Sequence, residues 1–592
     1  MSLSIRPCAS MLPESCWTTT TAANNDEGKR SPRFLSSNGV ATEDPIANRD
    51  REISDRGIIV QHHPFNLLCI DELVRLEDPT SGDGTSTKQL AVIDKYFADL
   101  RSESEKLLKT TDFWKPLNND LYCFRQSVDL SNLNERQFPM LAQIYQFLCS
   151  DVRSWVSQVT GCELNGNVAA TVSQYNYKDG LLPHDDQLES RRIAFVLYIS
   201  SPPDSSSGGT LDIFDTDDSS QPTKIVRSLA PAENRFVIFE VSNKSWHQVS
   251  EVVHPDFERI SVNGWFHADS VPKSDKPKSK SAFNQCLSKP GEIDFDTFTS
   301  WINCDYLDRA TQKQIRTEFE ESSEIELTNF LETSVCEELC YELLNESQSP
   351  DWLLSGPPNH SRYKCPKSMG NLPKSSICEK ILASDAMYLL LSQLTGLTLH
   401  PMFQNEDGTT HGSPAHDDGN AGCSTSVNET SSMEEPTSKK SRSMDLETST
   451  RCRHRAQLRR FEHTNYTLMS DMKADWYRRM GDALELQYFV TDREWPESHG
   501  GYTCYVASGS EPNEESDSSK GTPASGDDDN SEQDDNGDEL LTITPKPNSL
   551  ALVFRERDTL KFVKYVNADV NTAKTPYFCD FAASYYTEPK IE

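Results

Sequence analysis

The sequence predicts a mainly β, α+β protein that holds two antiparallel β domains, each flanked by helices. Short apolar runs separated by turn clusters fill residues 169–267, a pattern typical of an antiparallel sandwich or barrel. Helical apolar periodicity precedes these runs, and a similar succession of helices and strands follows in residues 286–592. The chain of 592 residues is also too long for one core, because single cores stop growing near ~250–300 residues.

Several segments are expected to stay disordered, which lowers the number of folded domains. The hydrophobic content is only 35%, and residues 1–54 are polar without periodicity. Two low-complexity insertions are predicted at 405–450 and 509–539, and the second sets twelve carboxylates against the single Lys520. We therefore expect folded domains at 55–270, with its core at 166–268, and at 286–592, joined by a polar linker at 271–285.

Charge and cysteine content restrict the class of protein. The formal net charge of -34 argues against general nucleic-acid binding, because phosphate contacts need clustered Lys and Arg, and it suits a basic protein partner. The sixteen cysteines are scattered, which is typical of reduced thiols. Neither an apolar signal core nor an 18-residue apolar run is found, so we expect a soluble, intracellular protein.

The elements of the first domain follow from periodicity. Leu141, Ile144, Leu148 and Trp155 share the apolar face of a helix that continues to Val159, and Gly161 is a plausible stop signal. The other elements predicted here are a helix at 88–109 and strands at 121–124, 192–200 and 235–240.

The second domain gives the same kinds of signal. The predicted helices are 312–321, 334–344 and 385–394, and the predicted strands are 484–490, 502–506 and 549–554.

The two domains also resemble each other as a degenerate internal repeat. Gly208-Gly209 has a counterpart in Gly500-Gly501, and the segment 231–239 matches 545–553 at an offset of 314. The same offset pairs His247 with Lys561, and the repeat pairs Arg259 with Thr575 at an offset of 316. Because a protonated lysine is a poor metal ligand, we expect the second copy to keep the fold without the metal.

Three residues in the first domain form a candidate metal centre. His184 and Asp186 are two apart, so on extended backbone their side chains point to one face, and Asp185 points away. His247 follows a distant strand and completes a 2-His-1-carboxylate set. Such a set occupies one face of Fe(II) and leaves the opposite face open.

A candidate anion site accompanies this centre. Arg259 and Ser261 share one face of their strand, and a guanidinium can bind a carboxylate through two hydrogen bonds. Tyr198 faces the interior of the predicted barrel, where it could supply a hydroxyl, and Tyr175 begins an aromatic strand before His184.

The letters His-x-Asp are not sufficient alone, because the chain contains a second copy. His416-Asp417-Asp418 lies in a Ser/Thr/Asn-rich tract with no strand beside it, so we interpret it as a solvated loop. The copy at His184 differs because strands, a Gly-Gly turn, His247 and Arg259 follow it in order.

The order Tyr175, His184-x-Asp186, His247, Arg259-x-Ser261 resembles the Fe(II)- and 2-oxoglutarate-dependent dioxygenases of the prolyl-hydroxylase type. The runs Leu-Pro-His-Asp-Asp at 182–186, Ser-Trp-His-Gln-Val at 245–249 and 550–564 are similar to a narrower group, the eukaryotic ribosomal prolyl 3-hydroxylases. The resemblance covers about 57–270 and 286–592 without the insertions. It implies that both domains are double-stranded β-helices, a jelly-roll variant, and that only the first is active.

The resemblance also implies residue roles and cofactors. His184, Asp186 and His247 would bind Fe(II), while Arg259 would hold 2-oxoglutarate with Tyr175, Tyr198 and Ser261, and ascorbate would act as reductant. The implied substrate is a proline of the small-subunit ribosomal protein at the decoding centre, with effects on translation accuracy and termination.

The resemblance and the charge pattern also give expectations about partners and compartments, and two other functions remain as alternatives. Translation-termination or mRNA-decay factors are possible partners, no membrane is expected, and the cytoplasm and nucleus are the expected compartments. The basic segments 273–280 and 439–442 are either nuclear signals or solvated linker charge. Two other functions stay open, a nucleic-acid demethylase with the same metal set and a non-enzymatic, ribosome-associated scaffold.

Overall fold

The computed structural model describes residues 58–74, 87–110, 113–188, 190–270, 287–345, 351–403, 452–507 and 539–587. The predicted disordered segments 1–54 and 405–450, the linker 271–285, and the copy His416-Asp417-Asp418 lie outside these ranges. The predicted insertion 509–539 is one residue too long, because Glu539 begins strand β21 (Glu539–Ile543), which pairs with β20 (Thr503–Ala507).

The first domain is one curled, 12-stranded antiparallel sheet with the strand order β1-β2-β10-β7-β12-β5-β4-β6-β11-β8-β9, and β3 pairs with β4. Its strands are β1 (Ile58–Gln61), β2 (Leu67–Ile70), β3 (Trp114–Asn118), β4 (Tyr122–Ser127), β5 (Val168–Tyr175), β6 (Gly180–His184), β7 (Arg191–Tyr198), β8 (Leu211–Thr216), β9 (Pro222–Leu229), β10 (Phe236–Glu240), β11 (His247–Val249) and β12 (Arg259–His267). Most consecutive strands from β5 to β12 do not pair with each other, and the chain crosses between distant strands of the sheet, which confirms the predicted jelly-roll.

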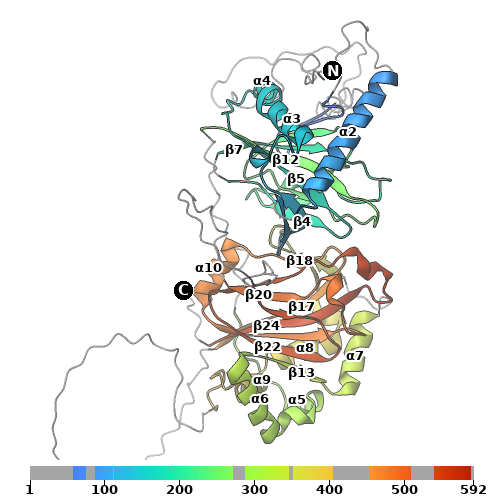
Figure 1. Cartoon of the computed structure of the whole chain (residues 1–592). Coiled ribbons are helices and arrows are strands. Elements are labelled where there is room, and N and C mark those ends of the chain that lie inside the picture. Colours follow the sequence, from blue (N-terminus) through green and yellow to red (C-terminus); the bar gives the residue numbers. More distant parts are fainter. Residues whose placement is uncertain are drawn as a thin grey trace, which may run out of the picture.

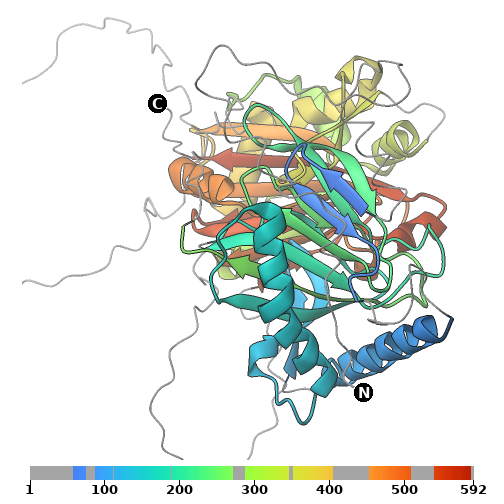
Figure 2. The same cartoon turned by 90° about the horizontal axis from the view of Figure 1, so that it is seen from above.

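Helices cover one face of this sheet, as Figures 1 and 2 show for α2 (Thr87–Leu107), α3 (Pro139–Phe147) and α4 (Arg153–Thr160). The predicted apolar face is buried, but a π-helical turn (Leu148–Val152) joins α3 to α4. Gly161 ends α4 with φ +69°, the left-handed conformation that glycine adopts without steric cost. Helices and sheet together bury a large core that includes Phe97, Leu141 and Trp155.

The second domain repeats the strand order of the first in two separate sheets. A 7-stranded sheet has the order β13-β22-β19-β24-β17-β16-β14, and a 5-stranded sheet has the order β15-β18-β23-β20-β21. The strands are β13 (Glu324–Thr328), β14 (Trp352–Leu354), β15 (Ser361–Arg362), β16 (Lys364–Pro366), β17 (Arg453–Glu462), β18 (Tyr466–Thr467), β19 (Ala483–Val490), β20, β21, β22 (Ser549–Arg555), β23 (Thr559–Val563) and β24 (Tyr577–Tyr586). The run β2-β10-β7-β12-β5 thus corresponds to β13-β22-β19-β24-β17, and β6-β11-β8-β9 corresponds to β18-β23-β20-β21.

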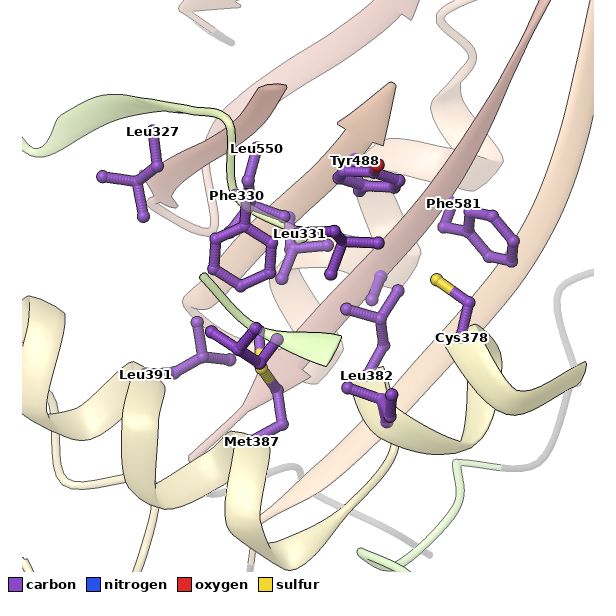
Figure 3. Packing of buried hydrophobic residues seen from close by; sticks show 14 of the residues in the cluster. Leu327, Phe330, Leu331, Cys378, Leu382, Met387, Leu391, Tyr488, Leu550 and Phe581 are labelled. Atoms are coloured by element: carbon purple, nitrogen blue, oxygen red, sulfur yellow. The ribbon is translucent and has the colours of Figure 1, made fainter. Parts of the chain in front are cut away.

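Helices pack on the larger of these sheets and close the second core. They are α5 (Phe295–Trp301), α6 (Arg309–Ser322), α7 (Thr333–Leu344), α8 (Pro373–Leu382) and α9 (Asp385–Thr395), and α10 (Asp471–Met480) lies near the first domain. Figure 3 shows Cys378, Leu382, Met387 and Leu391 of the helices facing Leu550 and other sheet residues. This core is separate from that of the first domain, as the sequence predicts.

Matching backbone details confirm the repeat. Asn234 and Asn548 both have positive φ, and each amide side chain bonds the backbone of one partner residue, Val74 and Leu331 respectively. Gly208 and Gly500 both need the absence of a side chain. A Cβ on Gly208 would lie 1.9 Å from the Glu251 carbonyl oxygen, and one on Gly500 would lie 1.8 Å from that of Tyr565.

The two domains contact each other beside the turn that joins β5 to β6. Tyr177 donates a hydrogen bond of 2.7 Å to Asp569, and Lys178 forms an ion pair of 2.7 Å with the same carboxylate. The buried Glu251 accepts hydrogen bonds from the His463 ring at 2.7 Å and the Ala568 amide at 2.8 Å. The second domain therefore fixes a turn that lies between the candidate site residues Tyr175 and His184.

Candidate metal centre

His184, Asp186 and His247 converge where strand β6 ends and strand β11 begins. The Asp186 carboxylate lies 3.5 Å from the Nε2 atom of each imidazole, one oxygen toward each ring. His184 and His247 are direct partners in the pairing of β6 with β11, and their ring centroids are 4.2 Å apart. Among the described residues, this is the one group of three or more His, Cys, Asp or Glu side chains close enough to share a metal ion.

Backbone carbonyls fix the orientation of both imidazoles. The Nδ1 atom of His184 lies 2.9 Å from the Leu182 carbonyl oxygen, and that of His247 lies 2.7 Å from the Ser245 carbonyl oxygen. An Nδ1–H that donates to a carbonyl leaves the Nε2 lone pair for a metal. Burial, and then the nearby His184, lower the pKa of His247 to about 4, so this ring is neutral and able to coordinate near pH 7.

The backbone conformation that brings Asp186 to the centre is not the one that the sequence predicted. It follows the end of β6 and has φ +62°, so its convergence with His184 comes from a left-handed turn and not from strand alternation. The indole N–H of Trp265 donates a hydrogen bond of 3.1 Å to its Oδ2 atom. Burial alone would raise the pKa of Asp186, but His247, His184 and Trp265 outweigh it and lower this pKa, so the carboxylate is ionised.

Ser245 ties together the two segments that carry the candidate ligands. Its hydroxyl donates to the Asp185 carbonyl oxygen at 2.8 Å, while its own carbonyl accepts from His247. The side chain is fully buried. Asp185 itself accepts from the Gln187 amide and stays outside the metal-binding group, as the sequence predicts.

Arg259, Ser261, Tyr175 and Tyr198 meet inside the same barrel. The Arg259 guanidinium is 2% exposed and lies 4.8 Å and 5.0 Å from the rings of Tyr175 and Tyr198. It donates to the Gly209 carbonyl oxygen at 2.8 Å and to the Ser261 hydroxyl at 3.3 Å. In the described part of the chain, no carboxylate forms an ion pair with this buried cation.

Two unpartnered hydroxyls support an anion at this position. The buried Tyr198 hydroxyl and the buried Ser173 hydroxyl have no hydrogen-bond partner among the residues that the structure describes. Burial raises the pKa of Tyr198, so its hydroxyl stays a donor. A buried polar group without a partner is unfavourable, and a carboxylate that accepts from these hydroxyls and Arg259 would satisfy all three. The residues present therefore fit both an Fe(II) ion and a dicarboxylate.

Sequence reasoning missed three residues of this site, namely Ser173, Ser245 and Trp265. Ser173 is paired with Ser261 across β5 and β12, and a strand pairing of this kind is its only signal. Trp265 follows Arg259 and Ser261 at even spacing, so strand alternation could have placed it on the same face. Ser245 lies next to the motif Trp246-His247 but carries no signal of its own.

The second domain has lost both halves of this site. Lys561 stands where His247 stands in the first domain, as predicted, and α10 begins where β6 would continue to its ligand residues. The predicted match of Arg259 with Thr575 is wrong. Phe578 takes the position of Arg259 instead. Phe578 pairs with Phe461 as Arg259 pairs with Tyr175, and it lies close to Gly501.

Comparisons with known proteins agree with this division. Residues 170–267 match the 2OG-Fe(II) oxygenase superfamily, and residues 293–590 match the family described as oxoglutarate and iron-dependent oxygenase degradation C-term. The first match covers all the candidate site residues, and the second covers the domain without a metal centre.

Similar relatives extend over most of the chain. The prolyl 3-hydroxylase OGFOD1 of Xenopus laevis is 35% identical over 83% of this chain and 86% of its own length. Its counterpart in Mus musculus is 34% identical over 81% of this chain and 85% of its own length. The prolyl 3-hydroxylase sudestada1 of Drosophila melanogaster is 31% identical over 78% of this chain and 77% of its own length.

Solved structures give a weaker likeness. A prolyl-4-hydroxylase from Pseudomonas putida is 19% identical over 30% of this chain and 88% of that chain, with a TM-score of 0.25, too low to add to the assignment. The relatives and both family matches are sufficient without it. The chain therefore belongs to the prolyl 3-hydroxylase family of Fe(II)- and 2-oxoglutarate-dependent oxygenases.

Proposed function

We propose that this chain hydroxylates carbon 3 of a proline in the small-subunit ribosomal protein at the decoding centre, and thereby affects translation accuracy and termination. Residues 55–270 are the catalytic domain and residues 286–592 the non-catalytic one. The observation that carries the proposal is the group of His184, Asp186 and His247 beside the unpaired, buried Arg259. The names of the relatives, which are prolyl 3-hydroxylases, support a prolyl residue as the target.

The proposed iron ligands are the Nε2 atoms of His184 and His247 and the carboxylate of Asp186. When bound, Fe(II) with 2-oxoglutarate and oxygen supplies the oxidation of a C–H bond to C–OH, coupled to the conversion of 2-oxoglutarate to succinate and carbon dioxide. The protein orients both imidazoles through backbone carbonyls and keeps His247 neutral, and Trp265 donates a hydrogen bond to the Asp186 carboxylate.

The proposed 2-oxoglutarate site is formed by Arg259, Ser261, Tyr175 and Tyr198. Arg259 would hold one carboxylate of 2-oxoglutarate, because a guanidinium in a water-excluded pocket gives a strong, oriented pair with a carboxylate. Ser261 and the Tyr198 hydroxyl donate to the same group. The Ser173 hydroxyl is a further donor that we add to this set.

Charge and chemistry support the proposed partners. A ribosomal protein is basic, and the net charge of -34 favours its encounter with this chain. Ascorbate is the proposed reductant that returns the metal to Fe(II), and termination or mRNA-decay factors are the proposed additional partners. Because ribosomal proteins occur in the cytoplasm and the nucleus, these are the proposed compartments. No helix among the described residues has the length and apolarity that a membrane span requires.

Succinate formation tests the proposed centre. The full chain with Fe(II), 2-oxoglutarate and a substrate peptide should release succinate, and Asp186→Ala should abolish this, since the metal loses its carboxylate ligand. The matched control is Asp418→Ala in the second His-x-Asp sequence, which should keep wild-type turnover. Turnover that persists in both Asp186→Ala and His184→Ala would overturn the assignment of the site.

A further inference from the structure

The second domain holds a cavity of about 170 Å³ at the place that the metal and anion sites occupy in the first. Three of its lining residues stand at positions that correspond to site residues. Lys561 corresponds to His247, Arg459 to Ser173 and Ser584 to Trp265, as the strand pairing of β17, β23 and β24 gives. The cavity is therefore the remnant of an oxygenase site, with changed chemistry.

The lining of this cavity is cationic. Arg455, Arg459, Lys473 and Lys561 contribute to it, and its other members are neutral or are histidine. No Asp or Glu is among the lining residues. A concave surface with charges of one sign and low-dielectric walls attracts counter-ions of the opposite sign.

Buried carboxylates behind the lining neutralise part of this charge. Glu485 is fully buried and bonds Lys561 at 2.5 Å and Arg555 at 2.8 Å. Asp580 forms two hydrogen bonds with Arg459, at 2.9 Å and 2.5 Å. Two carboxylates thus form ion pairs with three cations, namely Lys561, Arg555 and Arg459.

The two other cations of the lining, Lys473 and Arg455, form no ion pair with a carboxylate of the described residues. The Lys473 ammonium donates to the Lys561 carbonyl oxygen, and no carboxylate among the described residues forms an ion pair with it. The Arg455 guanidinium has no side-chain hydrogen bond or ion pair within the described ranges, although its backbone belongs to the β17–β24 ladder. The Asp120 carboxylate of the first domain acts on Lys473 only through space, and it accepts a hydrogen bond from the Met469 amide.

Burial, and then the neighbouring Lys561 and Arg459, lower the pKa of Lys473 to about 7, which shows how poorly its charge is compensated. A bound anion would supply the missing negative charge. The volume excludes nucleotides and other drug-sized ligands, whose pockets start near ~300 Å³. It is sufficient for a phosphate or a short dicarboxylate.

We propose that this cavity of the second domain is a binding site for a small free oxyanion, which Lys473 and Arg455 hold. Lys561, which is paired with Glu485, also lines the cavity. The 2-oxoglutarate mode of the first domain is excluded here, because Phe578 replaces Arg259 and Asp580 already occupies the guanidinium of Arg459. The proposal does not depend on the substrate or activity of the first domain.

Calorimetric titration of the full chain with inorganic phosphate, and separately with succinate, tests this site. An Arg259→Leu background removes carboxylate binding in the first domain. We expect one of the two anions to bind with a stoichiometry of one in this background. Lys473→Met and Arg455→Gln should each weaken binding by about tenfold or more, the usual effect of losing a hydrogen bond to a charged group. Arg478→Gln is the matched control, since Arg478 lies on the same helix and is 51% exposed.

The results separate this proposal from a purely structural role of the charges. Absence of binding by both anions, or equal binding by Lys473→Met, Arg455→Gln and the control, would overturn it. So would binding that disappears with Arg259→Leu, because the anion would then occupy the first domain. If circular dichroism shows that Lys473→Met does not fold, Arg455→Gln and the conservative Lys473→Arg decide. Loss of anion binding in Arg455→Gln together with retained anion binding in Lys473→Arg supports the site.

Discussion

Trp265 is the residue whose contribution to the metal centre is easiest to isolate. Its indole N–H donates to the Asp186 oxygen Oδ2, and the Arg191 guanidinium lies 3.5 Å from its ring. Trp265→Phe keeps an aromatic ring but removes this hydrogen bond. We expect the apparent Fe(II) affinity to fall by about 10–100-fold, the usual effect of losing a hydrogen bond to a metal ligand.

Fe(II)-dependent turnover at several metal concentrations measures this effect. Trp246→Phe is the matched control, because the Trp246 indole donates to the Ser220 carbonyl oxygen and not to a candidate ligand. If both variants required the same Fe(II) concentration as the wild type, Trp265 would not support the centre.

The three candidate ligands that the sequence predicted lie together in the structure, and there is a physical reason why their convergence could be predicted. A 2-His-1-carboxylate set must combine chemically specific residues, and His184, Asp186 and His247 follow strands that could hold them. The actual backbone of Asp186 could not be predicted, because a left-handed residue after a strand has no pattern in the letters. Ser173 and Ser245 were missed since serine occurs in many turns and strands.

Strand β19 carries a fully buried carboxylate of the second domain, Glu485. Glu485→Gln would leave Lys561 and Arg555 buried without a carboxylate, and breaking a buried ion pair costs about 3–5 kcal/mol. We expect a loss of this size in the free energy of unfolding at pH 7. Denaturation by urea measures it, and Glu494→Gln at an exposed position is the control.

The ionisation of Glu485 should also make the free energy of unfolding depend on pH. Burial would raise the pKa of Glu485, but Lys561 and Arg555 outweigh it and lower the pKa from 4.5 to about 2. A lowered folded-state pKa contributes stability that is complete above pH 4.5 and lost as the pH falls toward 2. The difference in unfolding free energy between wild type and Glu485→Gln should therefore shrink over this range. A difference that stays constant would contradict this assignment.

Elements with regular apolar patterns were predicted close to their true bounds, including α2, α7, α9, β7 and β19. Strand β17 was missed, because its inward positions include Arg455 and Arg459 and so lack the apolar alternation of a half-buried strand. The counterpart of Arg259 was misplaced for a related reason. The loop before β24 differs in length between the two domains, and only strand pairing shows the shift to Phe578.

Glu251 links the two domains across the middle of the molecule. It accepts from His463 and the Ala568 amide, and the Tyr565 hydroxyl lies 3.3 Å from it. Glu251→Ala removes the shared acceptor of all three donors. We expect faster proteolysis between the domains and reduced turnover, since the adjacent β5–β6 turn loses support. Glu258→Ala, which affects a residue of the first domain alone, is the control for both measurements. Equal behaviour of the two variants would show that the contact has no such role.

The sequence alone was sufficient to predict the duplication, because a Gly-Gly pair (208–209 and 500–501) and a later asparagine (Asn234 and Asn548) recur in the same order in both domains. It could not predict how the two copies meet. The contacts join residues hundreds of positions apart, such as Tyr177 and Asp569, and such polar pairs have no local signal. The cationic cavity was likewise invisible, since only the fold brings Arg455 and Lys473 to one lining.

Peptide mass spectrometry of the ribosomal protein is the most direct test of the central claim, that the first domain is a prolyl hydroxylase and the second is not. The small-subunit protein is incubated with Fe(II), 2-oxoglutarate and the full chain, or with Asp186→Ala or Asp418→Ala. We predict one added oxygen on a prolyl residue with the wild type and with Asp418→Ala, and none with Asp186→Ala. An unmodified protein after wild-type treatment, or the same modification with Asp186→Ala, would contradict the account.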